Sequence, residues 1–356
     1  MAPPTTPDGL RRLLIAPAPS GHETRAAEVF RELAADWADV SGDTVGNSVA
    51  RVTGTGDGPL LAIIGHADEI GVIVTHIDDN GFLRFQGLGG WDPTILAGQR
   101  VELIGTEGAV PGVVGRKPVH LLDSDARKKA PELKELHIDI GVRDGDAARR
   151  RVRVGDVGVL AADPVELGDG ILVSRALDNR LGCWIALEAA RRVHEAGGAA
   201  GDVAAVAATQ EELLPRMGGA GATAFRLDPD VAIVVDVHWE TRQPGVELGE
   251  FSKAEFGMGP IVTRGPQLHP AVSDALIAAA EAEGLPYVLE GAARGTGTDA
   301  DSVYLQRAGI PTGLISVPIR YLHSPGEMVD LADVEAAIGL LVAFAQRLDA
   351  SLPLQR

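Results

Sequence analysis

Cysteine is almost absent from this chain of 356 residues, which contains only Cys183. A single cysteine excludes an internal disulfide and a cysteine-rich zinc site, and it is consistent with a reducing compartment. Cys183 lies within 181–187, a segment that has the pattern of a buried helix start. We therefore interpret this thiol as structural and not as a nucleophile.

Long uncharged apolar runs are also missing from the chain. A membrane-spanning helix needs about 18 such residues in a row. No run in this sequence is that long, so we expect no membrane span. The N-terminal residues contain no apolar segment of the kind found in signal peptides. These two absences predict a cytoplasmic protein without a membrane partner.

Basic residues are in the minority, with 32 Lys and Arg against 50 Asp and Glu, for a formal net charge of −18. This balance argues against a nucleic-acid partner, which would require a basic surface. A solvated acidic surface accounts for most of the charge. The excess also favours attraction of a cationic group such as the free amino terminus of a peptide.

The pattern of apolar residues divides the chain into two kinds of region. The run 60–65 and two later apolar runs have the pattern of buried strands, and helical patterns lie between them. This alternation predicts an α/β domain with a mostly parallel central sheet flanked by helices. Between 70 and 163, short Val- and Ile-rich runs separated by turn residues predict an inserted small β-barrel. We therefore predict a main domain formed by 1–69 and 164–356 and a barrel domain at 70–163.

Imidazole and carboxylate groups follow the predicted strands, where open α/β sheets form their sites. His66 and Asp68 are two residues apart in an extended segment and so point the same way. His66 could bind a metal while Asp68 accepts its other ring N–H, although a capping turn explains the pair equally well. Asp178 precedes a predicted helix, where a helix cap is the simpler explanation and a carboxylate that bridges two metals is the alternative.

Four further positions extend this set. Glu211 and Glu212 follow the run 203–208, whose apolar character argues against a mere surface location. One of these carboxylates could bind a metal while its neighbour serves as a general base. Asp236 ends another apolar run, where turn capping is the alternative, and His323 lies in a loop, where a histidine is more often only solvated.

Together these positions supply imidazoles and carboxylates but no thiolate. Such a mixed ligand set suits Zn, Co or Mn. Five ligands of which one is a shared carboxylate suit a pair of ions roughly 3.5–4 Å apart. The sequence therefore predicts a dinuclear metal site at the edge of the main sheet.

The order of the motifs along the chain resembles one family, that of the glutamyl or deblocking aminopeptidases. These dinuclear metallopeptidases include the tetrahedral aminopeptidases, and some members are labelled endoglucanase. The resemblance covers nearly the whole chain. Its motifs are His-x-Asp-Glu at 66–69, Ala-Leu-Asp-Asn-Arg at 176–180, Gln-Glu-Glu at 210–212, Val-Asp-Val at 235–237, Gly-Thr-Asp-Ala at 297–300 and Pro-Ile-Arg-Tyr-x-His-Ser-Pro at 318–325.

The resemblance implies two divalent ions per subunit, Zn or Co, with Asp178 bridging them. The implied ligands are His66, Asp178 and Asp236 for one ion, and Asp178, Glu212 and His323 for the other. Glu211 would be the general acid and base, and Asp68 would orient His66. The main domain would be catalytic, the barrel would resemble a PDZ-like oligomerisation domain, and the particle would be a homododecamer acting on peptides.

The sequence departs from the family pattern at two places, Gly326 and the segment 237–244. Neither removes an implied ligand, but both could affect the substrate pocket, so the side-chain preference is left open. We therefore predict a metal-dependent aminopeptidase that hydrolyses N-terminal residues from peptides. The alternatives are a metal-dependent deacylase or a glycosidase-labelled hydrolase on the same scaffold, and a non-catalytic scaffold protein.

Overall fold

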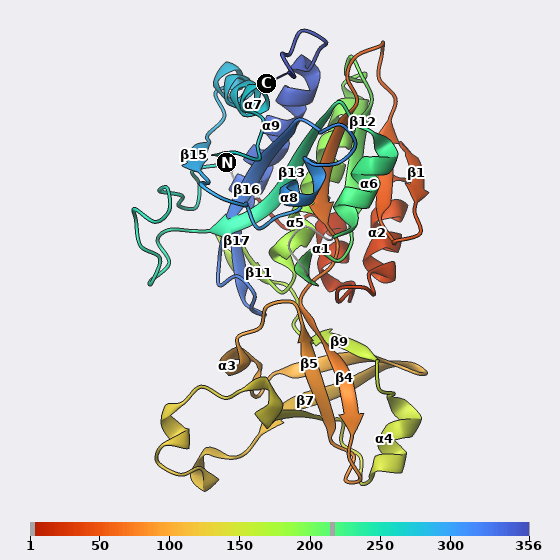
Figure 1. Ribbon diagram of the computed structural model, residues 1–356, viewed down its shortest axis with the longest axis vertical. Coiled ribbons are helices and arrows are strands. Elements are labelled where there is room, and N and C mark those ends of the chain that lie inside the picture. Colours follow the sequence, from red (N-terminus) through yellow and green to blue (C-terminus); the bar gives the residue numbers. More distant parts are fainter. Residues whose placement is uncertain (1–3, 214–217, 356) are drawn as a thin grey trace.

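The protein has two parts, a layered α/β domain and a β-barrel that extends from it (Figure 1). The computed structural model describes residues 4–213 and 218–355. Within these residues, the α/β domain contains an eleven-stranded sheet, and the barrel contains six strands. No helix of the described residues is long and apolar enough to cross a membrane.

The centre of the large sheet is parallel, and its two sides are antiparallel. Pairing is parallel from β12 through β3 and β13 to β16, and β2 and β17 join these central strands in antiparallel pairs. The strands run in the order β1 (Asp39–Gly42), β2 (Ser48–Val52), β12 (Val203–Ala208), β3 (Leu61–His66), β13 (Val231–Trp239), β16 (Thr312–Arg320), β17 (Glu327–Asp330), β11 (Ile171–Ser174) and β10 (Val165–Gly168), with β14 (Ile261–Arg264) beside β16 and β15 (Val288–Gly291) beside β14.

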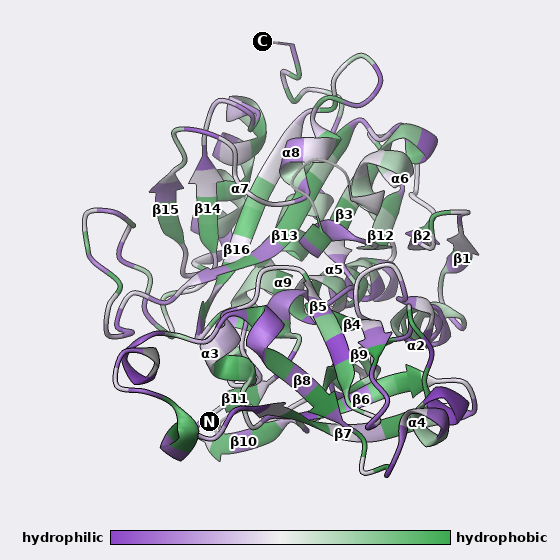
Figure 2. Ribbon diagram, turned by 60° about the horizontal axis from the view of Figure 1, so that its bottom comes forward, coloured by the Kyte–Doolittle hydropathy of each residue, from purple (hydrophilic) through white to green (hydrophobic). Residues whose placement is uncertain are grey.

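Helices cover both faces of this sheet because its central strands are apolar on both sides (Figure 2). Successive residues of a strand point to opposite faces, so Ile63 belongs to one hydrophobic core and Ile64 to the other. The first core contains α1 (Asp8–Ile15), α2 (Thr24–Ala34), α5 (Leu177–Glu195), α7 (Pro270–Glu283) and α9 (Leu331–Arg347), and the second contains α6 (Gly219–Leu227) and α8 (Ala300–Val303). The predicted α/β architecture is confirmed, with antiparallel strands added to its parallel centre.

The predicted barrel is also confirmed, as a closed structure with a hydrophobic interior of its own. Closure leaves no unpaired strand edge in so small a sheet. Its strands are β4 (Gly71–Ile77), β5 (Leu83–Leu88), β8 (Leu136–Asp139), β7 (Gly108–Arg116), β6 (Arg100–Gly105) and β9 (Val157–Leu160), accompanied by α3 (Pro93–Leu96) and α4 (Gly145–Arg151). The predicted domain boundaries, with a main domain formed by 1–69 and 164–356 and a barrel domain at 70–163, stay a prediction from the sequence.

The described residues also form short 3-10 helices. Three of them lie between β7 and β8 of the barrel, and the fourth follows β12 of the large sheet. They are η1 (Val119–Leu121), η2 (Ala126–Lys128), η3 (Leu133–Glu135) and η4 (Glu211–Leu213).

A buried cluster of charges joins the end of β3 to α1 and α5. Arg180 is fully buried, and its Nη2 lies 3.1 Å from Oε1 of Glu69, which also pairs with Arg175. Arg180 Nη1 donates to the carbonyls of Leu13 at 2.6 Å and Ala16 at 3.0 Å. Cys183, one turn further along α5, is fully buried, and burial raises the pKa of its thiol to about 12. The thiol is therefore buried in α5, as predicted.

Replacing Glu69 by Gln removes the carboxylate with which the buried Arg175 and Arg180 both pair. We expect the free energy of unfolding to fall by about 3–5 kcal/mol, as when one partner of a buried ion pair is removed. The matched control is Glu335→Gln, because Glu335 pairs with Arg192 on the surface, and a loss below about 1 kcal/mol is expected there. Denaturant titration measures both variants. Equal losses in the two would contradict the role given to the buried cluster.

Candidate metal centre

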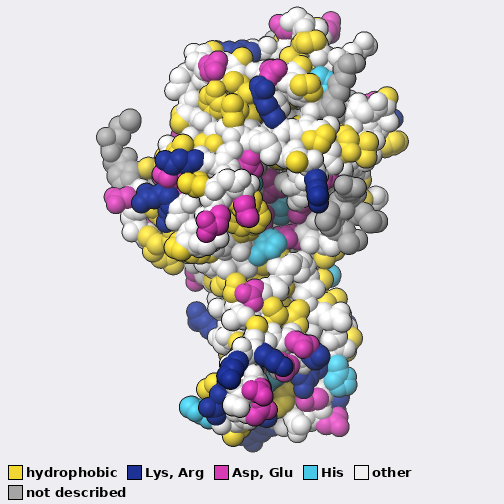
Figure 3. All heavy atoms as spheres, turned by 60° about the vertical axis from the view of Figure 1, so that its left-hand side comes forward, with side chains coloured by type: hydrophobic (Ala, Val, Ile, Leu, Met, Phe, Trp, Pro, Cys, Tyr) yellow, Lys and Arg dark blue, Asp and Glu magenta, His cyan; other side chains and the backbone are white. Residues whose placement is uncertain are grey.

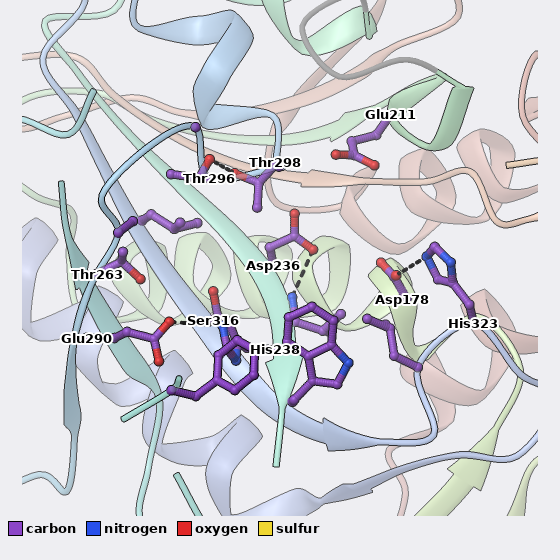
Figure 4. A pocket seen from close by; sticks show the side chains of 18 of the residues that line it. Asp178, Glu211, Asp236, His238, Thr263, Glu290, Thr296, Thr298, Ser316 and His323 are labelled. Carbon is purple, nitrogen blue, oxygen red and sulfur yellow. Dashed lines mark hydrogen bonds and ion pairs between the residues drawn. The ribbon is translucent and has the colours of Figure 1, made fainter. Parts of the chain in front are cut away.

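The predicted site residues meet at the carboxyl edge of the parallel strands. His66 is the last residue of β3, Asp236 lies in β13, and His323 follows the end of β16. Glu211 and Glu212 begin the short helix η4 that follows β12. The carboxyl ends of neighbouring parallel strands lie at one edge of a sheet. Residues that are far apart in the sequence are therefore neighbours in space (Figure 4).

Asp178 lies between the two imidazoles. Its Oδ1 is 3.1 Å from Nε2 of His66, and its Oδ2 is 3.3 Å from Nε2 of His323. Burial would raise the pKa of this carboxyl, but the contacts with His323 and His66 hold the pKa well below its ordinary value. One carboxylate thus presents each of its oxygens to a different imidazole, which is the arrangement of a carboxylate that can bridge two cations.

Asp68 holds several parts of the site together. Its Oδ1 lies 3.2 Å from Nδ1 of His66, which leaves Nε2 of that ring facing Asp178. The same carboxylate accepts hydrogen bonds from the backbone N–H groups of Glu211 and Glu212, both at 3.1 Å, and from the Ser20 hydroxyl at 2.7 Å. Asp68 therefore contacts the imidazole and fixes the turn that carries both glutamates.

The second imidazole is held by residues for which the sequence predicted no role. Nδ1 of His323 lies 2.9 Å from the carbonyl oxygen of Gly90, in the loop that follows β5 of the barrel. Glu327 accepts hydrogen bonds from the backbone N–H groups of His323 at 3.0 Å and Asp178 at 3.1 Å. Glu327 lies two residues beyond the motif at 318–325, and nothing in the sequence pointed to Gly90.

The remaining carboxylates crowd around this arrangement. Oε2 of Glu212 lies 3.4 Å from Nε2 of His323, whereas Oε2 of Glu211 lies 3.7 Å from Nε2 of His66. Burial raises the pKa of Glu211 to about 10 and that of Glu212 well above its ordinary value. Burial, together with repulsion from Asp178, raises the pKa of Asp236 to about 7. Carboxylates so close together need either protons or a cation.

The donors present fit a divalent cation. Ligand atoms of His66, Asp178 and Glu212 all lie within 4.8 Å of one another. Oε1 of Glu212 is buried and has no hydrogen-bond partner among the described atoms, although burial without a partner is costly. Neither Lys nor Arg occurs among the described residues that line the surrounding cavity. A metal ion would supply the positive charge that these carboxylates lack.

The candidate site opens into a cavity of about 680 Å³. Figure 3 shows acidic side chains and histidine inside a hollow of the α/β domain, on the side where the barrel joins it. Cavities of about 300–1,000 Å³ are typical of sites for small molecules and cofactors. A parallel sheet that places imidazoles and carboxylates around a shared aspartate, at the floor of such a cavity, defines a metal-dependent hydrolase.

Comparison with known proteins identifies the family. Residues 46–340 match the model of the M42 glutamyl aminopeptidases. The lysyl aminopeptidase of Pyrococcus furiosus is 32% identical over 95% of this chain and 96% of its own length. The chain belongs to the M42 glutamyl aminopeptidase family, and it is an aminopeptidase of this metallopeptidase family.

Solved structures of relatives show the same fold. The TET aminopeptidase from a marine sediment archaeon, Thaumarchaeota archaeon, has a TM-score of 0.90 at 32% identity and covers 97% of both chains. The TET1 peptidase of Pyrococcus horikoshii, which can assemble into a tetrahedron or a large octahedral shell, has a TM-score of 0.84 at 28% identity and covers 96% of this chain and 99% of that one. A further structure of the same similarity, PhTET1-12s, is a dodecamer.

Substituting Asp68 by Asn removes the charge that faces Nδ1 of His66. We expect metal affinity to fall about 10- to 100-fold, as is typical when the partner that orients a ligating histidine is lost. Competition with a chelating dye measures the dissociation constant for Zn²⁺. Asp78→Asn is the matched control, since Asp78 accepts backbone N–H groups in a barrel turn. An Asp68→Asn variant that binds Zn²⁺ as tightly as the control does would refute the role of Asp68.

Proposed function

We propose that the protein removes N-terminal residues from peptides with two divalent ions, Zn²⁺ or Co²⁺, that share the Asp178 carboxylate. The observation that supports this most strongly is the position of Asp178, whose two oxygens face the imidazoles of His66 and His323. A carboxylate with a single ion to bind would not require an imidazole beside each oxygen.

Each ion would have its own ligands in addition to Asp178. His66 and Asp236 would complete one set, and Glu212 and His323 the other. When bound, the two cations lower the pKa of a coordinated water and polarise the substrate carbonyl. The protein's own contribution is to fix the ligands, and Asp68, Glu327 and Gly90 do so through the contacts described above.

Glu211 is the carboxylate best placed to move a proton. It lies beside the candidate ligands but farther from the nearest imidazole than Glu212 does, and its side chain is 14% exposed toward the cavity. Its backbone N–H is held by Asp68, which fixes the position of the residue. We assign to Glu211 the removal of a proton from the attacking water and its delivery to the leaving amine. This role requires bound cations that offset the burial by which the pKa of Glu211 is raised.

The alternative hydrolases fit this site less well. A glycosidase usually places two free carboxylates on either side of the scissile bond. Here Asp178 and Glu212 already face imidazoles, and Asp236 accepts a hydrogen bond from the N–H of Val237 at 2.8 Å. A deacylase would act on a blocked amine, for which a cavity lined by carboxylates, with neither Lys nor Arg among its described lining residues, offers no advantage. A scaffold protein would not require this convergence of ligands.

The assembly of the protein is proposed from its relatives, and its location from the sequence. We propose a homododecamer, because the related TET1 peptidase structure is a dodecamer and because this chain has a barrel like that of its relatives. Peptides are the proposed substrates, and no nucleic acid is expected to bind. The cytoplasmic location stays a prediction from the sequence.

Glu211→Gln and Glu212→Gln should fail in different ways. Glu211→Gln should keep both ions and lose about 10²–10⁴ in kcat, because general acid–base groups typically contribute that much. Glu212→Gln should bind fewer ions, since it loses a charged ligand. Metal content by mass spectrometry and kcat on aminoacyl-p-nitroanilides measure the two effects.

The two glutamates control for each other, because they are adjacent and share a residue type. If Glu211→Gln loses an ion while Glu212→Gln keeps both, their roles are exchanged. Full activity in both variants would overturn the proposed mechanism.

A further inference from the structure

The cavity extends well beyond the candidate metal ligands. Figure 4 shows Asp178 and His323 at one end, Glu290 and Thr263 at the other, and Asp236 between them. The far end is built by the last residues of β13, by β14 and by β15. A substrate whose scissile bond lies at the metal end would direct its first side chain toward this far wall.

Glu290 is fixed in that wall. Its side chain is only 12% exposed, and its Oε1 lies 2.9 Å from Nε2 of His238. Its Oε2 accepts a hydrogen bond from the backbone N–H of Ser252 at 3.3 Å. Burial alone would raise the pKa of Glu290, but the contact with His238 lowers the pKa below its ordinary value. The carboxylate is thus charged and oriented, and a carboxylate with two partners still has acceptor capacity.

The charge of the far wall is negative. Of the carboxylates that line the cavity, Asp178, Glu211, Glu212 and Asp236 belong to the candidate metal centre, where bound cations would offset them. Glu250 and Glu290 remain, and neither Lys nor Arg lines the cavity within the part of the chain that the structure describes. An acidic substrate side chain would be repelled from this wall, whereas a basic one would be attracted.

Aromatic side chains stand next to Glu290. The rings of Trp239 and Phe251 have centroids 5.0 Å apart, and the ring of His238 is 5.4 Å from that of Phe251 at 75°. Both Trp239 and Phe251 line the cavity. An apolar surface beside a carboxylate suits a side chain with an alkyl stem and a cationic end. His238 and Trp239 come from 237–244, one of the segments in which the sequence departs from the family pattern.

We propose that the enzyme prefers peptides that begin with Lys or Arg, whose side-chain cation binds the Glu290 carboxylate. This inference rests on the proposed aminopeptidase function and adds the substrate class to it. The alkyl stem lies against Trp239 and Phe251, and Glu290 determines the specificity. The excess of acidic residues over the whole chain also attracts basic peptides.

The test compares two substrates that differ mainly in charge, lysyl-p-nitroanilide and norleucyl-p-nitroanilide. Wild-type kcat/KM should be about 10- to 100-fold higher for the lysyl substrate, the range expected for a hydrogen bond between charged groups. Glu290→Gln should lower this ratio about 10-fold or more by slowing only the lysyl substrate. Glu283→Gln is the matched control, because it removes the same charge from an exposed residue that pairs with Arg347 and does not line the cavity. Its ratio should equal that of the wild type.

Each other outcome has a distinct meaning. A wild-type ratio of lysyl to norleucyl kcat/KM near or below one overturns the proposal. This measurement needs no variant, so the proposal can be tested even if Glu290→Gln fails to fold. An equal loss on both substrates in Glu290→Gln also overturns it, because Glu290 would then hold the N-terminal ammonium. If the wild-type enzyme hydrolyses neither substrate, nor alanyl- and glutamyl-p-nitroanilide, after loading with Zn²⁺ or Co²⁺, the proposed function fails, and with it this inference.

Discussion

The contact of the Asp178 carboxylate with His66 on one side and His323 on the other organises the whole candidate site. Three parts of the chain must come together to make it: the end of β3, the beginning of α5 and the loop after β16. The parallel centre of the sheet brings the first and third to one edge. Glu327 then ties the second to the third, since its carboxylate accepts the N–H groups of both Asp178 and His323.

The same geometry brings several buried carboxylates close together, where they repel one another. Burial raises the pKa of Glu211, Glu212 and Asp236, and the same holds for Asp299 and Glu327 nearby. Groups that are this costly to bury persist where they have a function. A pair of divalent cations would turn the mutual repulsion into attraction. The barrel takes part as well, because the Gly90 carbonyl holds the ring of His323.

Apolar runs made the centre of the fold predictable, since β3, β12 and β13 are buried on both faces and therefore almost purely apolar. The outer strand β10 is exposed along its whole length and carries no such pattern. The burial of Arg180 could not be predicted either. An arginine is rarely fully buried without a partner, and the partner of Arg180 is Glu69, 111 residues away in the sequence. The motifs located the candidate ligands. Gly90 stayed hidden because it contacts His323 through its backbone, 233 residues away.

A shared Asp178 carboxylate is the central claim, and anomalous diffraction from zinc-loaded crystals tests it most directly. Data recorded above and below the zinc absorption edge should show two peaks per chain, roughly 3.5–4 Å apart. One peak should lie beside each oxygen of Asp178, the first near His66 and the second near His323. A single peak under saturating zinc, or two peaks that do not both contact Asp178, would contradict the account.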